Sequence, residues 1–230
     1  NHLDLDVKSY VLLGQGQQIV RMFQELELKS CLANLEIFLS TLLPLIEEYK
    51  LKYKKDFSYQ ILQEGLHYDH CIMVTLFSLI IARDQKILSQ KLLRSIALAS
   101  LFHDVSLGSQ IARDTDSENY KNHPLESVKM LSNLPYFEAS TLQSIRQHHM
   151  RLRGESFPEK MKNEVLSQNS QIIGLSDDLN RFFQEFKSEI YSEKNGQAKM
   201  ILEETILNQI SRSLLGPTMK DLLIKLRLCS

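Results

Sequence analysis

The chain has 230 residues, of which 43% are hydrophobic and 24% charged, and its formal net charge is -1. This composition is typical of a globular protein with a sizeable apolar core, and the near-neutral charge argues against a nucleic-acid polymer as partner. The longest apolar stretch covers only residues 71–82, whereas a membrane span needs roughly 20 residues. The three cysteines have no disulfide or metal spacing, so we expect a reducing, cytoplasmic location.

Long segments with helical apolar spacing, and few glycines or prolines, predict an all-α fold. The first such segment includes Leu32 and Leu45 and ends in the polar, basic run 49–56. We interpret this run as a boundary between a small helical N-terminal region (1–57), with a regulatory or partner-binding role, and the main domain (58–230). A solvated charged face within one long helix explains the run equally well.

The next helical segment begins near a histidine on its apolar face. Its apolar stripe follows the spacing i, i+4, i+7 and i+11 through His70, Val74, Phe77 and Ile81. This spacing directs His70 toward the buried side of the helix. His67 lies three residues earlier on nearly the same face and is the rival candidate.

A second apolar stripe ends at the doublet His103-Asp104 and includes Leu92, Ile96 and Ala99. A histidine at the core end of a helix, followed directly by a carboxylate, can deliver both side chains into one cavity. His103 and Asp104 are therefore expected to share a site.

Three further histidines follow. His123 precedes Pro124, and because proline suits the first turn of a helix, we expect His123 at a helix cap. A third stripe includes Ile145 and ends at the doublet His148-His149. Both rings of that doublet can reach one pocket near the helix end.

Two adjacent aspartates, Asp177 and Asp178, lie in the next apolar helical segment. Burying a carboxylate there costs several kcal/mol unless it is paired or bound to metal, and spacing alone does not choose between the two. Imidazole and carboxylate suit divalent transition metals, and this set exceeds what one tetrahedral ion needs. The sequence therefore predicts a two-metal hydrolytic site, with buried, hydrogen-bonded histidines as the alternative.

The order of these groups resembles the HD-GYP branch of the HD superfamily of metal-dependent phosphohydrolases. The matching segments are HCIMV from His70, LFHDVSLG around His103, NHPLESVKML around His123, IRQHHMRLRGESFP from Ile145 and IIGLSDDLN around Asp177. The resemblance covers about residues 58–186 and implies an HD-domain helical bundle. It selects His70 over His67 and Asp177 over Asp178.

The resemblance implies a dinuclear metal centre in which the catalytic residue Asp104 bridges two divalent ions. The implied metal ligands are His70, His103, Asp104, His123, His148, His149 and Asp177. Iron is the first expectation for the ions and manganese the alternative. The implied substrate is cyclic di-GMP, cleaved to the linear dinucleotide or to GMP in bacterial signalling, and a GGDEF-type or other signalling protein is a candidate partner.

The chain departs from the family pattern at several positions. Leu107 replaces a lysine implied to touch the substrate phosphate, and Phe157 replaces the tyrosine of GYP. Leu66 stands where members with three ions carry a glutamate, which favours two ions. Arg151 and Arg153 are expected to bind the substrate phosphate, with solvated loop charges as the alternative.

Three functions are therefore open. The first is a cyclic di-GMP phosphodiesterase, which the complete ligand series favours. The second is a metal-binding HD hydrolase of another phosphoester, favoured by Leu107 and by the altered GYP segment. The third is a catalytically weak signalling or docking module, against which the retained ligand series argues.

Overall fold

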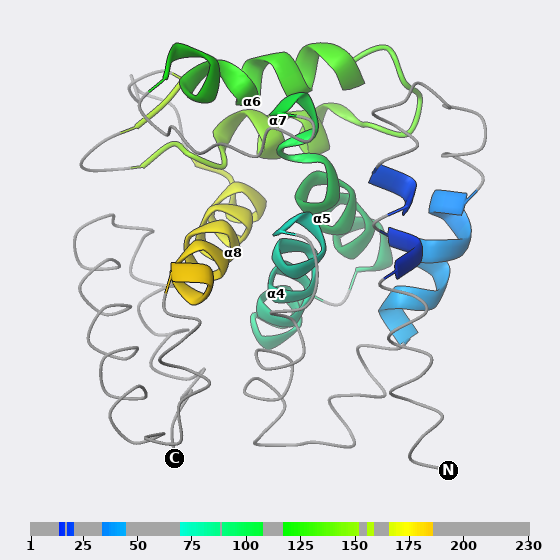
Figure 1. Cartoon of the computed structure of the whole chain (residues 1–230). Helices are drawn as coiled ribbons and strands as arrows, with labels where there is room; N and C mark the ends of the chain where they lie inside the picture. Colours follow the sequence, from blue (N-terminus) through cyan, green and yellow to red (C-terminus); the bar gives the residue numbers. More distant parts are fainter. Residues whose placement is uncertain are drawn as a thin grey trace, which may run out of the picture.

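The computed structural model contains helices throughout the residues that it describes (Figure 1). The described residues are 14–16, 18–20, 34–44, 70–87, 89–107, 117–151, 156–158 and 166–185. Within these ranges the predicted all-α class is confirmed. None of the helices described there is long and apolar enough to cross a membrane. The predicted boundary at 57/58 lies outside the described residues and stays a prediction.

Helix α4 (His70–Asp84) is the central helix of the core. Residues 71–79 are all buried, because α4 is apolar around almost its whole circumference. The helix ends at Asp84, and Lys86 in the turn that follows has a φ of 61°, in the left-handed region. There the Lys86 and Ile87 amides donate to the carbonyls of Arg83 and Ala82, a pairing that satisfies the last turn of the helix.

Helices α5 (Gln90–Phe102) and α8 (Gln168–Glu185) pack against α4. Ser89 caps α5, because its hydroxyl accepts a hydrogen bond from the Leu92 amide. The apolar stripe predicted for α5 is correct from Ile96 onward, whereas Leu92 is 45% exposed.

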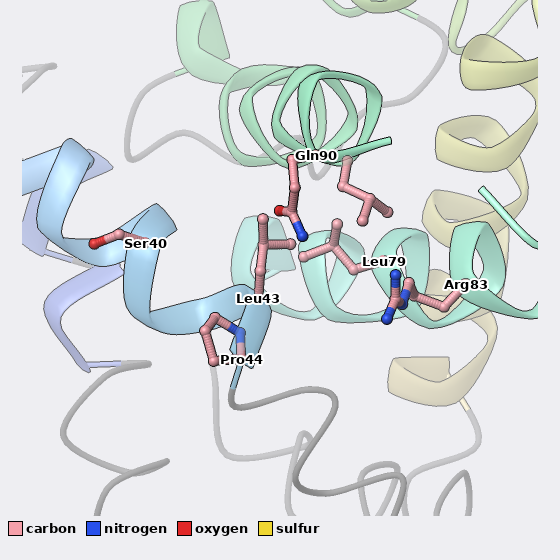
Figure 2. A pocket seen from close by; sticks show the side chains of 7 residues that line it. Ser40, Leu43, Pro44, Leu79, Arg83 and Gln90 are labelled. Carbon is pink, nitrogen blue, oxygen red and sulfur yellow. The ribbon is translucent and has the colours of Figure 1, made fainter. Parts of the chain in front are cut away.

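The helical segment 34–44 borders the opposite side of the core (Figure 1). Its Phe38 and Leu42 are fully buried in the same core as α4 and α5, and its Glu36 pairs with Arg94 of α5. A cavity of about 340 Å³ lies between this segment, α4 and α5. Figure 2 shows Leu43 and Pro44 on one side of that cavity and Gln90 on another. None of the predicted metal ligands lines the cavity.

Helices α6 (Glu118–Leu131) and α7 (Ala139–Gln147) lie across one end of α5 and α8 (Figure 1). The short 3-10 helix η1 (Val105–Leu107) follows α5 and contacts α6. The expectation that His123 caps a helix is wrong, because α6 begins five residues earlier. Ser117 caps it by accepting from the Tyr120 amide, and Pro124 lies inside it.

Candidate metal centre

The predicted ligands come together where several helices begin or end. His70 opens α4, His103 and Asp104 directly follow α5, and the doublet 148–149 directly follows α7. The other two ligands, His123 and Asp177, project from within α6 and α8. The structure thus brings side chains from five helices, spread over more than a hundred residues, into one cluster.

Asp104 lies at the centre of this cluster. Its Oδ1 atom is 2.9 Å from His123 Nε2 and 3.6 Å from His148 Nε2. Its Oδ2 atom is 3.6 Å from His70 Nε2 and 3.5 Å from His103 Nε2. Each oxygen of this one carboxylate therefore faces a different pair of imidazoles.

Asp177 closes the cluster from α8. Its Oδ1 atom is 3.0 Å from His70 Nε2, and its Oδ2 atom is 3.6 Å from His149 Nε2. Arg181, one turn further along the helix, donates from Nε to Oδ1 over 2.9 Å. The adjacent Asp178 points elsewhere, and both of its oxygens accept hydrogen bonds from Arg151 Nη2.

Backbone carbonyls orient three of the rings, including those of His103 and His148. His103 Nδ1 donates to the Ser100 carbonyl over 2.8 Å, and His148 Nδ1 donates to the Ile145 carbonyl over 2.6 Å. A carbonyl can only accept, so each Nδ1 carries the proton. Each Nε2 lone pair is then directed into the cluster, which is the arrangement that a metal-binding histidine needs.

His123 is the third ring that a backbone carbonyl orients, and a side-chain amide orients His70. Pro124 has no N–H to donate to the Tyr120 carbonyl one turn earlier, and His123 Nδ1 occupies that acceptor instead. Pro124, which the sequence suggested as a helix start, thus leaves a carbonyl of α6 free to orient the ring of His123. His70 Nδ1 contacts Asn180 Oδ1 at 2.6 Å, so its Nε2 also faces the carboxylates.

Burial and charge set the protonation of the cluster. Burial lowers the pKa of His103 to about 3 and also lowers the pKa values of His148 and His149. Burial opposes ionisation of Asp104, but the imidazoles of His103, His123 and His148 hold its pKa well below the usual value. Near neutral pH, His103, His148 and His149 are therefore neutral beside an ionised Asp104, the state in which such groups bind metal.

The cluster fits divalent transition-metal ions. Both oxygens of Asp104 and Oδ2 of Asp177 are buried without a hydrogen bond from any described residue, and a buried ionised oxygen is costly unless a cation satisfies it. Two sets of donor atoms, each within 4.8 Å of one another, overlap at Asp104. One set adds His70 and His103, and the other adds His123 and the 148–149 doublet.

The residues expected to bind substrate have a different placement. Arg151 is only 8% exposed. It is bound to both oxygens of Asp178 at 2.9 and 2.8 Å and to the His148 carbonyl at 2.7 Å. Its guanidinium therefore joins α8 to the end of α7. Arg153 lies outside the described residues. Phe157 packs its ring 4.3 Å from the ring of His149.

Sequence reasoning missed three residues that contact the cluster. Asn180 and Arg181 follow Asp177 at i+3 and i+4 on the same helix face. Tyr120 precedes His123 by three residues, and its hydroxyl is 3.4 Å from His149 Nε2. The helical spacing relative to a predicted ligand was the signal that could have identified each of them.

A sequence model of the HD domain family matches residues 74–208, more than half of the chain. The chain belongs to the HD domain family, whose members are generally metal-dependent phosphohydrolases. A search of curated proteins found no match.

A solved structure with the same fold is that of Bd1817, an HDG"Y"P protein from Bdellovibrio bacteriovorus. It superposes with a TM-score of 0.65 over 96% of this chain and 70% of the other, at 12% sequence identity. At that identity the likeness shows the fold alone. Together with the family match, it supports the resemblance to HD-GYP proteins.

Gly174 permits the close approach of α8 to the residues that follow α7. A Cβ atom at this position would overlap the His148 carbonyl oxygen and lie 3.0 Å from Arg151 Nη1. We expect Gly174→Ala to lower the free energy of unfolding by about 3 kcal/mol, as overpacking does, although alanine is the better helix former. Chemical denaturation measures the change. Gly14→Ala is the matched control, because nothing lies within 4 Å of the added methyl group; equal effects of the two would contradict the contact.

The lowered histidine pKa values predict that the chelated protein is acid-labile. A folded-state pKa below the unfolded value of about 6.5 means that stability falls as pH drops below 6.5, because only the unfolded state takes up the proton. His103, at about 3, contributes a loss of about 2 kcal/mol at pH 5. His148 and His149 act in the same direction, whereas the raised pKa values of His70 and Asp178 act in the opposite one.

Thermal unfolding at pH 8, 6.5 and 5 in the presence of a chelator tests this balance. We expect the midpoint temperature to fall steadily toward pH 5, and the variant His103→Gln, which cannot titrate, to fall less. A midpoint that is constant or rises toward pH 5 would rule out the neutral, buried state of these imidazoles.

Proposed function

We propose that this chain is a dinuclear-metal phosphodiesterase that hydrolyses cyclic di-GMP to the linear dinucleotide or to GMP. The observation that carries the proposal is the position of Asp104, whose two oxygens face separate imidazole pairs and belong to two overlapping sets of donor atoms. One carboxylate shared by two sets is the arrangement that a pair of bridged ions requires.

The predicted ligands of the chain would bind the two ions in two groups. His70, His103 and Asp177 would bind one ion, His123 with the 148–149 doublet would bind the other, and Asp104 would be a ligand of both. Two divalent ions bound there would act as Lewis acids on the phosphodiester and activate water for in-line attack. A donor set rich in imidazole, with two carboxylates, suits iron first and manganese as the alternative.

Turnover of cyclic di-GMP tests the proposal most directly. The protein would be purified without oxygen, loaded with iron or manganese, and assayed for the linear dinucleotide and GMP, with metal content measured on the same sample. We expect two ions per chain and turnover that the variant Asp104→Ala lacks. Two bound ions without any turnover of cyclic di-GMP would show that cyclic di-GMP is not the substrate.

Hydrolysis of another phosphoester is the second candidate function. Phe157 favours it, because its apolar ring lies against His149, 4.3 Å between ring centroids, and offers no hydroxyl to a guanine nucleotide. Leu107 in η1 likewise carries no charge. A panel of nucleotide monoesters, cyclic mononucleotides and a chromogenic phosphodiester separates this function from the first. A metal-loaded protein inert toward the whole panel would instead be a signalling or docking module.

A further inference from the structure

Arg181 lies at the outer edge of the candidate metal centre. Its Nε donates to Asp177 Oδ1 over 2.9 Å, and Asp177 is fully buried, whereas the Arg181 side chain is 35% exposed. Of the arginines and lysines that the structure describes, Arg181 is the one that forms an ion pair with a predicted ligand. The partly exposed guanidinium group thus extends from the buried cluster toward solvent, and the Nε–H bound to Asp177 is one of the five N–H donors that a guanidinium carries.

An aromatic ring from a different helix holds this guanidinium. The Arg181 guanidinium carbon lies 5.2 Å from the centroid of the Tyr120 ring, within the range of a cation–π interaction. The centroid of the Tyr120 ring in turn lies 5.7 Å from that of His149 and 5.5 Å from that of Phe157, with the rings tilted to one another. Two contacts therefore restrict the guanidinium of Arg181, one with Asp177 in α8 and one with the ring of Tyr120 in α6.

A phosphoester at this centre needs a cation besides the ions. Its non-bridging oxygens carry negative charge that increases toward the transition state, and a preorganised guanidinium is well suited to neutralise it. Arg151 cannot do so in the observed arrangement, because its Nη2 atom is bound to Asp178 and its Nη1 atom to two backbone carbonyls. Arg181 has the opposite environment, partly exposed and adjacent to a ligand.

We propose that Arg181 binds a non-bridging phosphate oxygen of the substrate at the metal centre, held in position by Asp177 and the Tyr120 ring. The inference rests on the proposed function, because it requires a phosphoester bound beside the ions. It assigns substrate binding to a residue of α8 instead of to Arg151, while Arg153 lies outside the described residues.

Inorganic phosphate is the probe for the test. Calorimetric titration of phosphate into the manganese-loaded protein measures the dissociation constant, and metal content is determined on the same samples. Arg181→Gln removes the charge, Arg181→Lys keeps it without the planar fork, and Lys129→Gln is the matched control. Lys129 lies on α6, and its side chain is 77% exposed and pairs with Glu126 rather than with the cluster.

We expect Arg181→Gln to keep the wild-type metal content and to bind phosphate about tenfold more weakly, the effect of losing one charge-assisted hydrogen bond. Arg181→Lys should lie between this variant and the wild type, and Lys129→Gln should match the wild type. Unchanged phosphate affinity in Arg181→Gln would overturn the inference. So would loss of metal from that variant, because Arg181 would then act only by positioning Asp177.

The same samples separate this inference from the proposed function. Phosphate binding that depends on Arg181, in a metal-loaded protein that hydrolyses no phosphoester, would support the inference and refute the hydrolase. Wild-type protein that takes up no metal would overturn both.

Discussion

Asp104→Ala is expected to remove both ions from the centre and to abolish turnover. Asp104 is the described carboxylate with one oxygen facing His70 and His103 and the other facing His123 and His148. Without it, each set of imidazoles loses its anionic donor and the two sets are no longer joined. Loss of an outer-shell partner already weakens metal binding by about 10- to 100-fold, so loss of a shared ligand should exceed 100-fold.

Metal content per chain, measured after gel filtration, and turnover on the same sample check this result. Asp178→Asn is the matched control, because Asp178 is a carboxylate next to the predicted ligand Asp177 but binds Arg151 and not the cluster. It should keep both ions. Retention of two ions in Asp104→Ala would refute the bridging role.

The stability of the Asp104→Ala variant is checked without metal. Both Asp104 oxygens are buried without a hydrogen bond from any described residue, so in the chelated protein the side chain is a desolvated anion near imidazoles with lowered pKa values. Replacing an unsatisfied buried group by an apolar one is often neutral or stabilising. The lowered pKa of Asp104 acts in the opposite direction, because the neighbouring imidazoles favour its ionised form in the folded state. The unfolding temperatures of the chelated variant and the chelated wild type, measured side by side, verify that the variant is folded.

The sequence could predict the parts of this molecule that depend on one helix at a time. Apolar spacing placed His70 on the buried face of α4 and put the doublets 103–104 and 148–149 at helix ends, and the structure has them there. It also predicted the all-α class. These features follow from helical periodicity, which is a local property of the chain.

The remaining features depend on contacts between helices, which periodicity does not determine. Pro124 was expected at a helix start, but the helix continues through it because His123 Nδ1 occupies the Tyr120 carbonyl that lacks its usual donor. Arg151 was expected to bind substrate, but α8 brings Asp178 to it. Arg181 was overlooked, although its distance of one turn from Asp177 was visible in the sequence.

Removal of the ions is expected to destabilise the whole fold, because the centre is made by five helices. A ligand at about 1,000 times its dissociation constant stabilises the native state by about 4 kcal/mol, and in a chain of this size that corresponds to a fall of about 10 °C in the unfolding temperature. The physical cause is local. Asp104 and Asp177 are buried carboxylates, and three of their oxygens accept no hydrogen bond from a described residue, so a bound cation would offset the cost of burying their charge.

Scanning calorimetry with and without a chelator measures this loss, and the choice of ion used for recovery tests the site itself. Manganese or iron should restore the unfolding temperature, whereas magnesium should not, because it prefers oxygen ligands in near-ideal octahedral geometry and the cluster is mostly imidazole. The variant Asp104→Ala should be insensitive to the chelator. A wild-type protein equally insensitive to it would mean that the buried imidazoles and carboxylates stabilise one another without metal, as hydrogen-bonded core residues do.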